Sequence, residues 1–170
     1  MYLDGFVDNT GTSIGGYGDW DVLVLRYDIN GSFMWNHYGG SVEEDRLESL
    51  SANQKGEVQF GGKHLANMTF GSNTLAMNGT AGAFDGFMVQ VDDNSNLQWA
   101  LSIGGDGNDS VEALLTKSDG SIIAGGEFSL TVYFGDIPKS ATDTDIFVWQ
   151  FQHDKDCLLY TSPSPRDNTT

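Results

Sequence analysis

The strongest constraint on the fold is that the chain repeats itself at a spacing of 64 residues, as from Trp35 to Trp99. Residues with special backbone or packing roles coincide at this spacing. The coinciding pairs are Asp21 and Asp85, Asp28 and Asp92, Trp35 and Trp99, Asp45 and Asp109, Glu48 and Glu112, Gly56 and Gly120, Gly61 and Gly125, Gly62 and Gly126, Phe70 and Phe134, and Gly71 and Gly135. Shared Trp, Asp and Gly positions at one spacing predict a duplicated structural unit.

The repeat continues beyond these two copies. The segment DIFVWQFQHD from Asp145 parallels DVLVLRYDIN from Asp21 and DGFMVQVDDN from Asp85. The paired glycines at 39–40 and 104–105 also correspond, provided that one residue slips in the loop. The sequence therefore predicts the end of a preceding unit and a linker at 1–18, full units at 19–82 and 83–142, and the start of a further unit at 143–156.

Each unit has the pattern of short strands joined by tight turns. Apolar residues alternate with period two over 22–27 and 85–91, which is typical of a strand. Asp, Asn, Gly and Ser follow each of these strands and favour a hairpin turn. Further strands are predicted from Phe33 and Leu97 to the paired glycines, at 47–52 and 111–116, at 58–61 and 122–125, and in short segments ending at Phe70 and Phe134.

Four strands per unit predict an all-β fold, and specifically an incomplete β-propeller. It would contain about two full four-stranded antiparallel blades, at 19–82 and 83–142, with partial blades at both ends. One local alternative is a helix over 42–50, because VEEDRLESL consists largely of helix-forming residues. The repeat favours a strand there, since the equivalent segment 109–116 is a poor helix.

The ordered features of each unit resemble a known family. Residues 85–135 begin with Asp-Gly-Phe and pass through a polar turn to Trp99 and a Gly-Gly pair, then an Asp-rich loop, an Asp-Gly turn and a second Gly-Gly pair. This order resembles the bacterial seven-bladed β-propeller repeat (SBBP) and covers about residues 1–155. The resemblance implies a structural or interaction module in a secreted or cell-surface bacterial protein. It implies no catalytic residue set.

The charge of the chain excludes some classes of partner. There are 24 acidic residues against 8 basic ones, a net charge of -16. Sequence-independent nucleic-acid binding depends on Lys and Arg that neutralise phosphates, so no nucleic-acid partner is expected. The longest aliphatic run, 22–25, is far shorter than the ~20 residues of a spanning helix, so no membrane insertion is expected.

Two oxygen-rich loops are candidates for calcium. Asp106, Asn108 and Asp109 offer oxygen ligands at short spacing, as does the segment 92–96. The alternative in both loops is that Asp and Asn accept backbone N–H bonds and shape a turn. The loop 41–45, equivalent to 106–109, is also acidic. Neither of these two loops has the full DxDxDG pattern with a distal Glu, so no metal residue is assigned and calcium stays an alternative.

The remaining reactive residues do not form a catalytic pattern. The Asp-to-Trp spacing at Trp35 and Trp99 is similar to the tryptophan-docking motif of quinoprotein propellers, where the Trp is structural. His37, His64 and His153 occupy different positions of the repeat, and no metal-binding or triad spacing is present. Because Glu48 and Glu112 are repeat-equivalent, they indicate a structural role. We assign no catalytic or cofactor-binding residue.

The C-terminal segment departs from the repeat. The string CLLYTSPSPRD at 157–167 resembles a translated sequencing adapter, so residues 157–170 are predicted to be a non-native tail. The alternative is a natural Ser/Pro-rich linker. Cys157 is the one cysteine of the chain, so no intramolecular disulfide can form.

These observations predict a non-catalytic repeat module of an extracellular or cell-surface bacterial protein. A scaffold or a surface for an unknown protein or glycan ligand is expected, together with contacts to the remaining blades of the same propeller. The chain shows no signal peptide and would be a fragment with two exposed apolar blade faces that favour self-association. One alternative is a propeller enzyme, either a quinoprotein or a hydrolase, whose site is supplied by missing blades. Another is a calcium-stabilised adhesin module.

Overall fold

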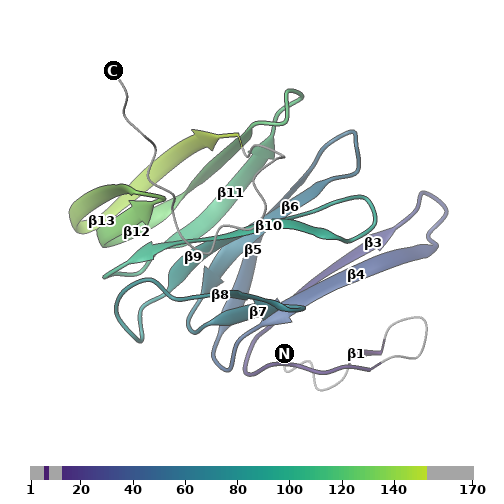
Figure 1. Ribbon diagram of the computed structural model, residues 1–170, viewed down its shortest axis with the longest axis horizontal. Coiled ribbons are helices and arrows are strands. Elements are labelled where there is room, and N and C mark those ends of the chain that lie inside the picture. Colours follow the sequence, from purple (N-terminus) through teal and green to yellow (C-terminus); the bar gives the residue numbers. More distant parts are fainter. Residues whose placement is uncertain (1–5, 8–12, 153–170) are drawn as a thin grey trace.

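The computed structural model describes residues 6–7 and 13–152 and is all-β (Figure 1). The described residues form thirteen strands and no helix. The strands are β1 (Phe6–Val7), β2 (Ser13–Ile14), β3 (Val22–Tyr27), β4 (Phe33–Gly40), β5 (Asp45–Ala52), β6 (Val58–His64), β7 (Met68–Phe70), β8 (Asn73–Leu75), β9 (Asp85–Val91), β10 (Leu97–Gly105), β11 (Ser110–Thr116), β12 (Ile122–Phe134) and β13 (Ile137–Phe151). Strands are present at the predicted places, except that the segment ending at Phe134 is the end of the long strand β12 and not a separate strand. The alternative helix over 42–50 is replaced by β5.

Apart from β1 and β2, which pair only with each other, the strands form three layers that lie side by side (Figure 1). The first layer is the sheet β3-β4-β7-β8. The middle layer is β5-β6-β9-β10, and the third layer is β11 with the paired parts of β12 and β13 over 122–128 and 145–151. The middle and third layers belong to one antiparallel sheet that folds back on itself, because the end of β12 pairs with the end of β10. This sheet is nearly closed, since β11 comes to lie against β5.

The boundaries of the sheets do not coincide with the boundaries of the sequence units. β6 pairs with β9, with Gly61 opposite Met88, and the repeat reproduces this register in Gly125 opposite Val148. Each such sheet therefore joins the third and fourth strands of one unit to the first two of the next. The expectation that the four strands of one unit form one sheet is wrong. The end of β4 pairs instead with β7, through Gly39 and Gly40, which leaves the edge of β6 to β9. The unit boundaries themselves remain predictions.

The register also removes the slip assumed between the paired glycines. Gly40 lies opposite Thr69, and Gly104 lies opposite Tyr133. Both pairs keep the common spacing, so Gly40 corresponds to Gly104 without a shift. The one-residue slip predicted from the sequence is wrong, because Gly39 is equivalent to Ile103 and not to a glycine.

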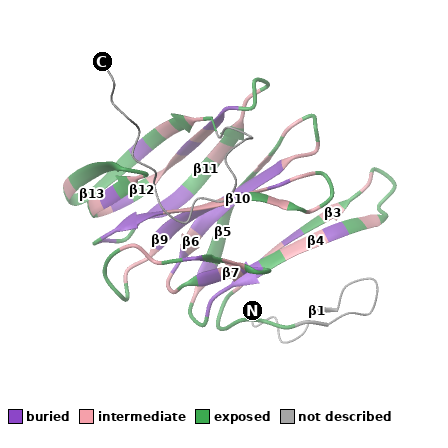
Figure 2. Cartoon of the chain, in the orientation of Figure 1, coloured by how far each residue is buried: buried purple, intermediate pink, exposed green. Residues whose placement is uncertain are grey.

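The two central strands of the middle layer, β6 and β9, are buried on both faces, whereas β5 at its edge is largely exposed (Figure 2). Phe87, Val89 and Val91 of β9 pack against the first layer, and Met88 packs against the third. Full burial of each large apolar side chain contributes about 1.5–3 kcal/mol, so the two inter-layer cores are the main source of stability. Trp35 and Trp99 occupy equivalent inter-layer positions, one in each core.

The hairpin turns share one geometry that requires a left-handed residue. In each turn the first residue accepts a hydrogen bond from the N–H three residues later and donates to the carbonyl four residues later. The left-handed residue is Gly31, Gly56, Ser95 or Gly120, with φ between 67° and 86°. Glycine adopts this conformation at little cost, which explains its place in three of the four turns. The turns predicted at 28–31 and 92–95 are confirmed.

Candidate functional site

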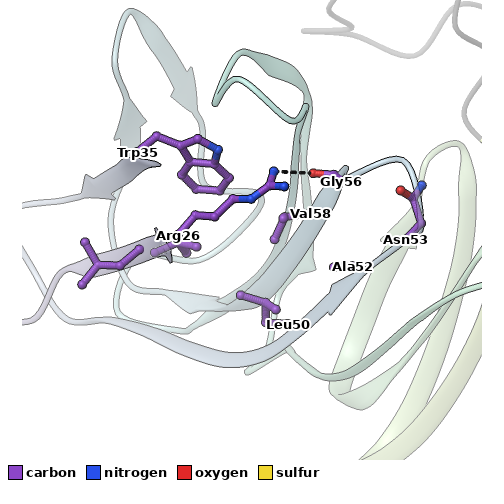
Figure 3. Close-up of a pocket in the computed structure, with 9 residues that line it drawn as sticks. Arg26, Trp35, Leu50, Ala52, Asn53, Gly56 and Val58 are labelled. Carbon is purple, nitrogen blue, oxygen red and sulfur yellow. Dashed lines mark hydrogen bonds between the residues drawn. The ribbon is translucent and has the colours of Figure 1, made fainter. Parts of the chain in front are cut away.

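A cavity of about 260 Å³ lies between the first and middle layers (Figure 3). It is formed where the β3–β4 hairpin faces β5, β6 and their connecting turn. The lining residues are Val24, Leu25, Arg26, Trp35, Leu50, Ala52, Asn53, Gly56 and Val58. None of them is an acid, a histidine, a serine or a cysteine, so the lining contains neither a nucleophile nor a general acid or base.

The cavity lies where the repeat carries smaller side chains. At the equivalent place between the middle and third layers, the rings of Trp99 and Phe151 pack edge to face, with their centres 5.9 Å apart. The repeat equivalent of Phe151 is Val91, which leaves Trp35 without such a neighbour. Ala52 and Val58 likewise stand where the next unit has Thr116 and Ile122. Of the smaller side chains, Ala52 and Val58 line the cavity, and they leave volume that Thr116 and Ile122 fill at the equivalent place.

Arg26 supplies the charge beside this cavity, and that charge is already paired. Its guanidinium forms an ion pair with the Asp93 carboxylate and donates to the carbonyl oxygens of Gly56 and Asp93, both at 3.2 Å. It also lies 5.8 Å from the ring centre of Trp35, within cation–π range. The equivalent of Arg26 is Gln90, so this cation is not a repeated feature. The site is therefore an apolar cavity with a neutralised polar rim.

Asn53 lines the cavity but uses its amide within its own turn. Its Oδ1 accepts hydrogen bonds from the backbone N–H groups of Lys55 and Glu57, and its Nδ2 donates to the Glu57 carboxylate at 2.6 Å. These bonds hold the turn that forms one wall. The arrangement can enclose a small apolar group and offers few polar contacts to it.

A second group of chemically distinctive residues is a set of buried aspartates. Burial raises the pKa of Asp45, Asp85 and Asp109 to about 7, and the neighbouring Asp85 adds to the effect on Asp109. Burial also raises the pKa of Asp21, which in turn acts on Asp45. The aspartates therefore form two repeat-equivalent pairs, Asp21 with Asp45 and Asp85 with Asp109.

Backbone groups hold these carboxylates in place. Asp45 accepts hydrogen bonds from the N–H and the hydroxyl of Ser41, and Asp85 accepts one from the N–H of Asn78. Within the described part of the chain, Oδ1 of Asp85 and Oδ2 of Asp109 are buried and have no hydrogen-bond partner. A buried carboxylate oxygen without a partner favours the protonated form. The pairs are thus sensitive to protons near neutral pH.

The loop considered for calcium uses its oxygens in backbone contacts. Oδ1 of Asn108 accepts the N–H of Phe84 at 3.0 Å, and Oδ1 of Asp109 accepts that of Ser129 at 3.3 Å. Over 92–96, Asp92 accepts the N–H groups of Asn94 and Asn96. The pattern over 92–96 is that of a local turn, whereas Asn108 and Asp109 tie their loop to segments that are distant in sequence. No cluster of three or more His, Cys, Asp or Glu residues that could hold a metal occurs between residues 13 and 152.

The other residues singled out in the sequence are dispersed. His37 lies between the first two layers, stacked on Phe70, whereas His64 is fully buried and contacts Ser102. Glu48 lies 3.9 Å from Lys63 on β6. His153 and Cys157 lie outside the described residues. Sequence reasoning missed the cavity, although comparing Ala52 and Val58 with their larger repeat equivalents Thr116 and Ile122 would have indicated it.

Comparison with known proteins adds no family assignment. No protein-family model matches the chain, and no curated protein matches it. The described residues contain no helix with the length and apolar character needed to cross a membrane.

Proposed function

We propose that the chain is a non-catalytic β-propeller repeat module of a secreted or cell-surface bacterial protein. Its role is that of a scaffold, or of a surface that binds a protein or a glycan. The observation that carries this proposal is the presence of two outer sheet faces whose repeat equivalents are buried inside the molecule. Layers of this kind complete their burial only when further layers stack on them.

The outer face of the third layer supports this most directly. Ile146 and Val148 are 79% and 78% exposed. Their equivalents in the middle layer are Gly86 and Met88, and Met88 is fully buried by the third layer. The exposed pair therefore occupies positions that a following layer covers elsewhere in the molecule.

The outer face of the first layer is also exposed where the equivalent face of the middle layer is buried. Leu25 and Tyr27 are 37% and 52% exposed, whereas their equivalents Val89 and Val91 are fully buried. Among the described residues, therefore, no layer covers the outer face of the first layer and none covers that of the third. Contacts with the remaining blades of the same propeller follow from this proposal.

The chemistry of the third layer's outer face differs from that of the middle layer. Across the inner interface, the hydroxyls of Ser49 and Ser51 accept the N–H groups of Leu114 and Thr116, at 2.9 and 3.0 Å. The equivalents of these serines on the third layer are Ala113 and Leu115. A layer that docks there meets an apolar surface, so the contact depends on apolar burial.

Sedimentation velocity over a range of protein concentrations tests this proposal. The chain is expected to self-associate through its apolar faces, and Val148→Lys is expected to reduce that association. The matched control is Val42→Lys, because Val42 is 75% exposed in the loop between β4 and β5, away from the stacking faces. A monomer at all concentrations, or an equal effect of both substitutions, would contradict the proposal.

A further inference from the structure

The third layer lacks one strand that the middle layer has. In the middle layer β9 pairs on one side with β6 and on the other with β10, from Leu97 opposite Val91 to Ile103 opposite Gly86. Residues 145–151 of β13 correspond to β9 and pair with β12 in the same register. Between residues 13 and 152 no strand pairs with the other edge of 145–151. Among these residues, the position that β10 takes in the middle layer is therefore unfilled in the third layer.

The open edge carries none of the usual protections against strand pairing. Edge strands are commonly blocked by charged residues, by proline or by a bulge. The segment 146–151 reads IFVWQF, with no charge and no proline, and its pairing with β12 is regular. No strand of the described part of the chain is paired with the outer N–H and C=O groups of this segment, so these groups can form a ladder with an added strand.

We infer that this edge of β13 binds one antiparallel strand supplied by another repeat of the same type. The register follows from the β9–β10 pair: the Trp of the added strand lies opposite Gln150, and the residue four positions later lies opposite Ile146. The partner is thus an extended segment of the β10 kind, with a Trp followed by a Gly-Gly pair. This inference rests on the proposed function, because it names the element by which further repeats attach.

A specific side-chain contact distinguishes this register from general edge pairing. In the middle layer the indole N–H of Trp99 donates to Oε1 of Gln90 at 3.1 Å. Gln150 is the repeat equivalent of Gln90 and is exposed on β13. An added strand would place its Trp beside Gln150 and form the same hydrogen bond. The neighbouring Phe147 and Trp149 already face the inner core, so they need no rearrangement.

The test uses a labelled synthetic peptide with the sequence of β10, LQWALSIGG, and the intact chain. Fluorescence anisotropy is expected to show saturable 1:1 binding. Two further peptides carry N-methyl groups on alternate sets of residues, since only one set of N–H groups faces the partner strand. Loss of binding with one set alone supports strand addition. No binding of the parent peptide, or equal binding of both methylated peptides, would overturn it.

A double-mutant cycle tests the register. Gln150→Ala in the chain and Trp99→Phe in the peptide are each expected to weaken binding about three- to tenfold, the value of one hydrogen bond. The two changes together should cost no more than either alone. The matched control is Gln98→Ala in the chain, with the peptide unchanged, because Gln98 is an exposed glutamine of the middle layer. Additive losses would contradict the register. Failure of peptide binding while Val148→Lys still reduces self-association would sink this inference and leave the proposed function standing.

Discussion

The carboxylate of Asp85 occupies the space that a side chain at Gly104 would need. A Cβ atom at Gly104 would lie 2.1 Å from Oδ1 of Asp85, and one at Gly40 would lie 1.8 Å from Oδ1 of Asp21. The repeat thus keeps a glycine beside a buried aspartate at the end of a strand in both units. The glycine is required for space, since its φ is not in the left-handed region.

This relationship predicts that Gly104→Ala destabilises the chain by about 1–3 kcal/mol, because the buried Asp85 carboxyl must move. Urea unfolding measures the change. Gly125→Ala is the control, since a Cβ there meets no atom closer than 3.6 Å. It should be neutral or slightly stabilising, and equal losses in both variants would disprove the steric explanation.

The raised pKa values of Asp45, Asp85 and Asp109 predict stability that falls as pH rises. Their pKa values are about 7 when folded and near the ordinary 3.8 when unfolded, so the folded chain binds more protons between these limits. The stabilisation is fully present below about pH 4 and is lost as pH rises through about 7. Thermal unfolding followed from pH 5 to pH 8 should show a decreasing midpoint temperature.

Asp85→Asn isolates one contribution to this slope. The neutral amide cannot lose a proton, so the variant should show a shallower decrease of unfolding temperature with pH than the parent chain. The general decrease of repulsion at lower pH, expected for a net charge of -16, remains in both proteins. An unchanged slope would mean that Asp85 is not protonated in the folded state.

The turn at Ser95 predicts a difference between two small substitutions. Ser95 has a φ of 67°, and its hydroxyl donates to the carbonyl of Asn36 at 3.1 Å. Ser95→Gly and Ser95→Ala both remove this hydrogen bond, but only glycine adopts the left-handed conformation at little cost. The glycine variant should therefore be more stable than the alanine variant by about 1 kcal/mol. Chemical denaturation of the pair checks this, and equal stabilities would argue against a strained turn.

The cavity beside Trp35 predicts that added volume is tolerated on one side of the first core. Val58→Ile restores the side chain of its repeat equivalent, Ile122, and should stabilise the chain by about 0.5–2 kcal/mol through cavity filling. Val22→Ile is the control, because Val22 is 1% exposed and does not line the cavity. That variant should be destabilised by overpacking. A loss of stability in both would show that the cavity is too small to use.

Local features of the fold could be predicted from the sequence, whereas strand partners could not. Alternation over 22–27 and turn residues such as Asn30 and Gly31 act within a few residues, so strands and hairpins were placed well. The pairing of β6 with β9 is set by long-range competition for an edge. The sequence repeat is the same whether each sheet is formed within one unit or from strands of two neighbouring units. The repeat alone therefore does not predict which strands pair.

The candidate site could be predicted only in part from the sequence, again because it depends on contacts between distant residues. Asp85 and Asp109 stood out as repeated residues, but their burial depends on loops that close over them in three dimensions. In the sequence, Arg26 is distinguished only by being one of 8 basic residues. Its ion pair with Asp93 joins residues from two layers and has no local pattern in the sequence.

The central claim is that sheets form across the unit boundary and stack. Cross-strand backbone NOEs in an NMR spectrum of the chain test it most directly. The account predicts contacts between Gly62 and Phe87 and, at the equivalent place, between Gly126 and Phe147. Contacts joining the edge of β4 to β5 in place of these pairs would show that each unit forms its own sheet and would contradict the account.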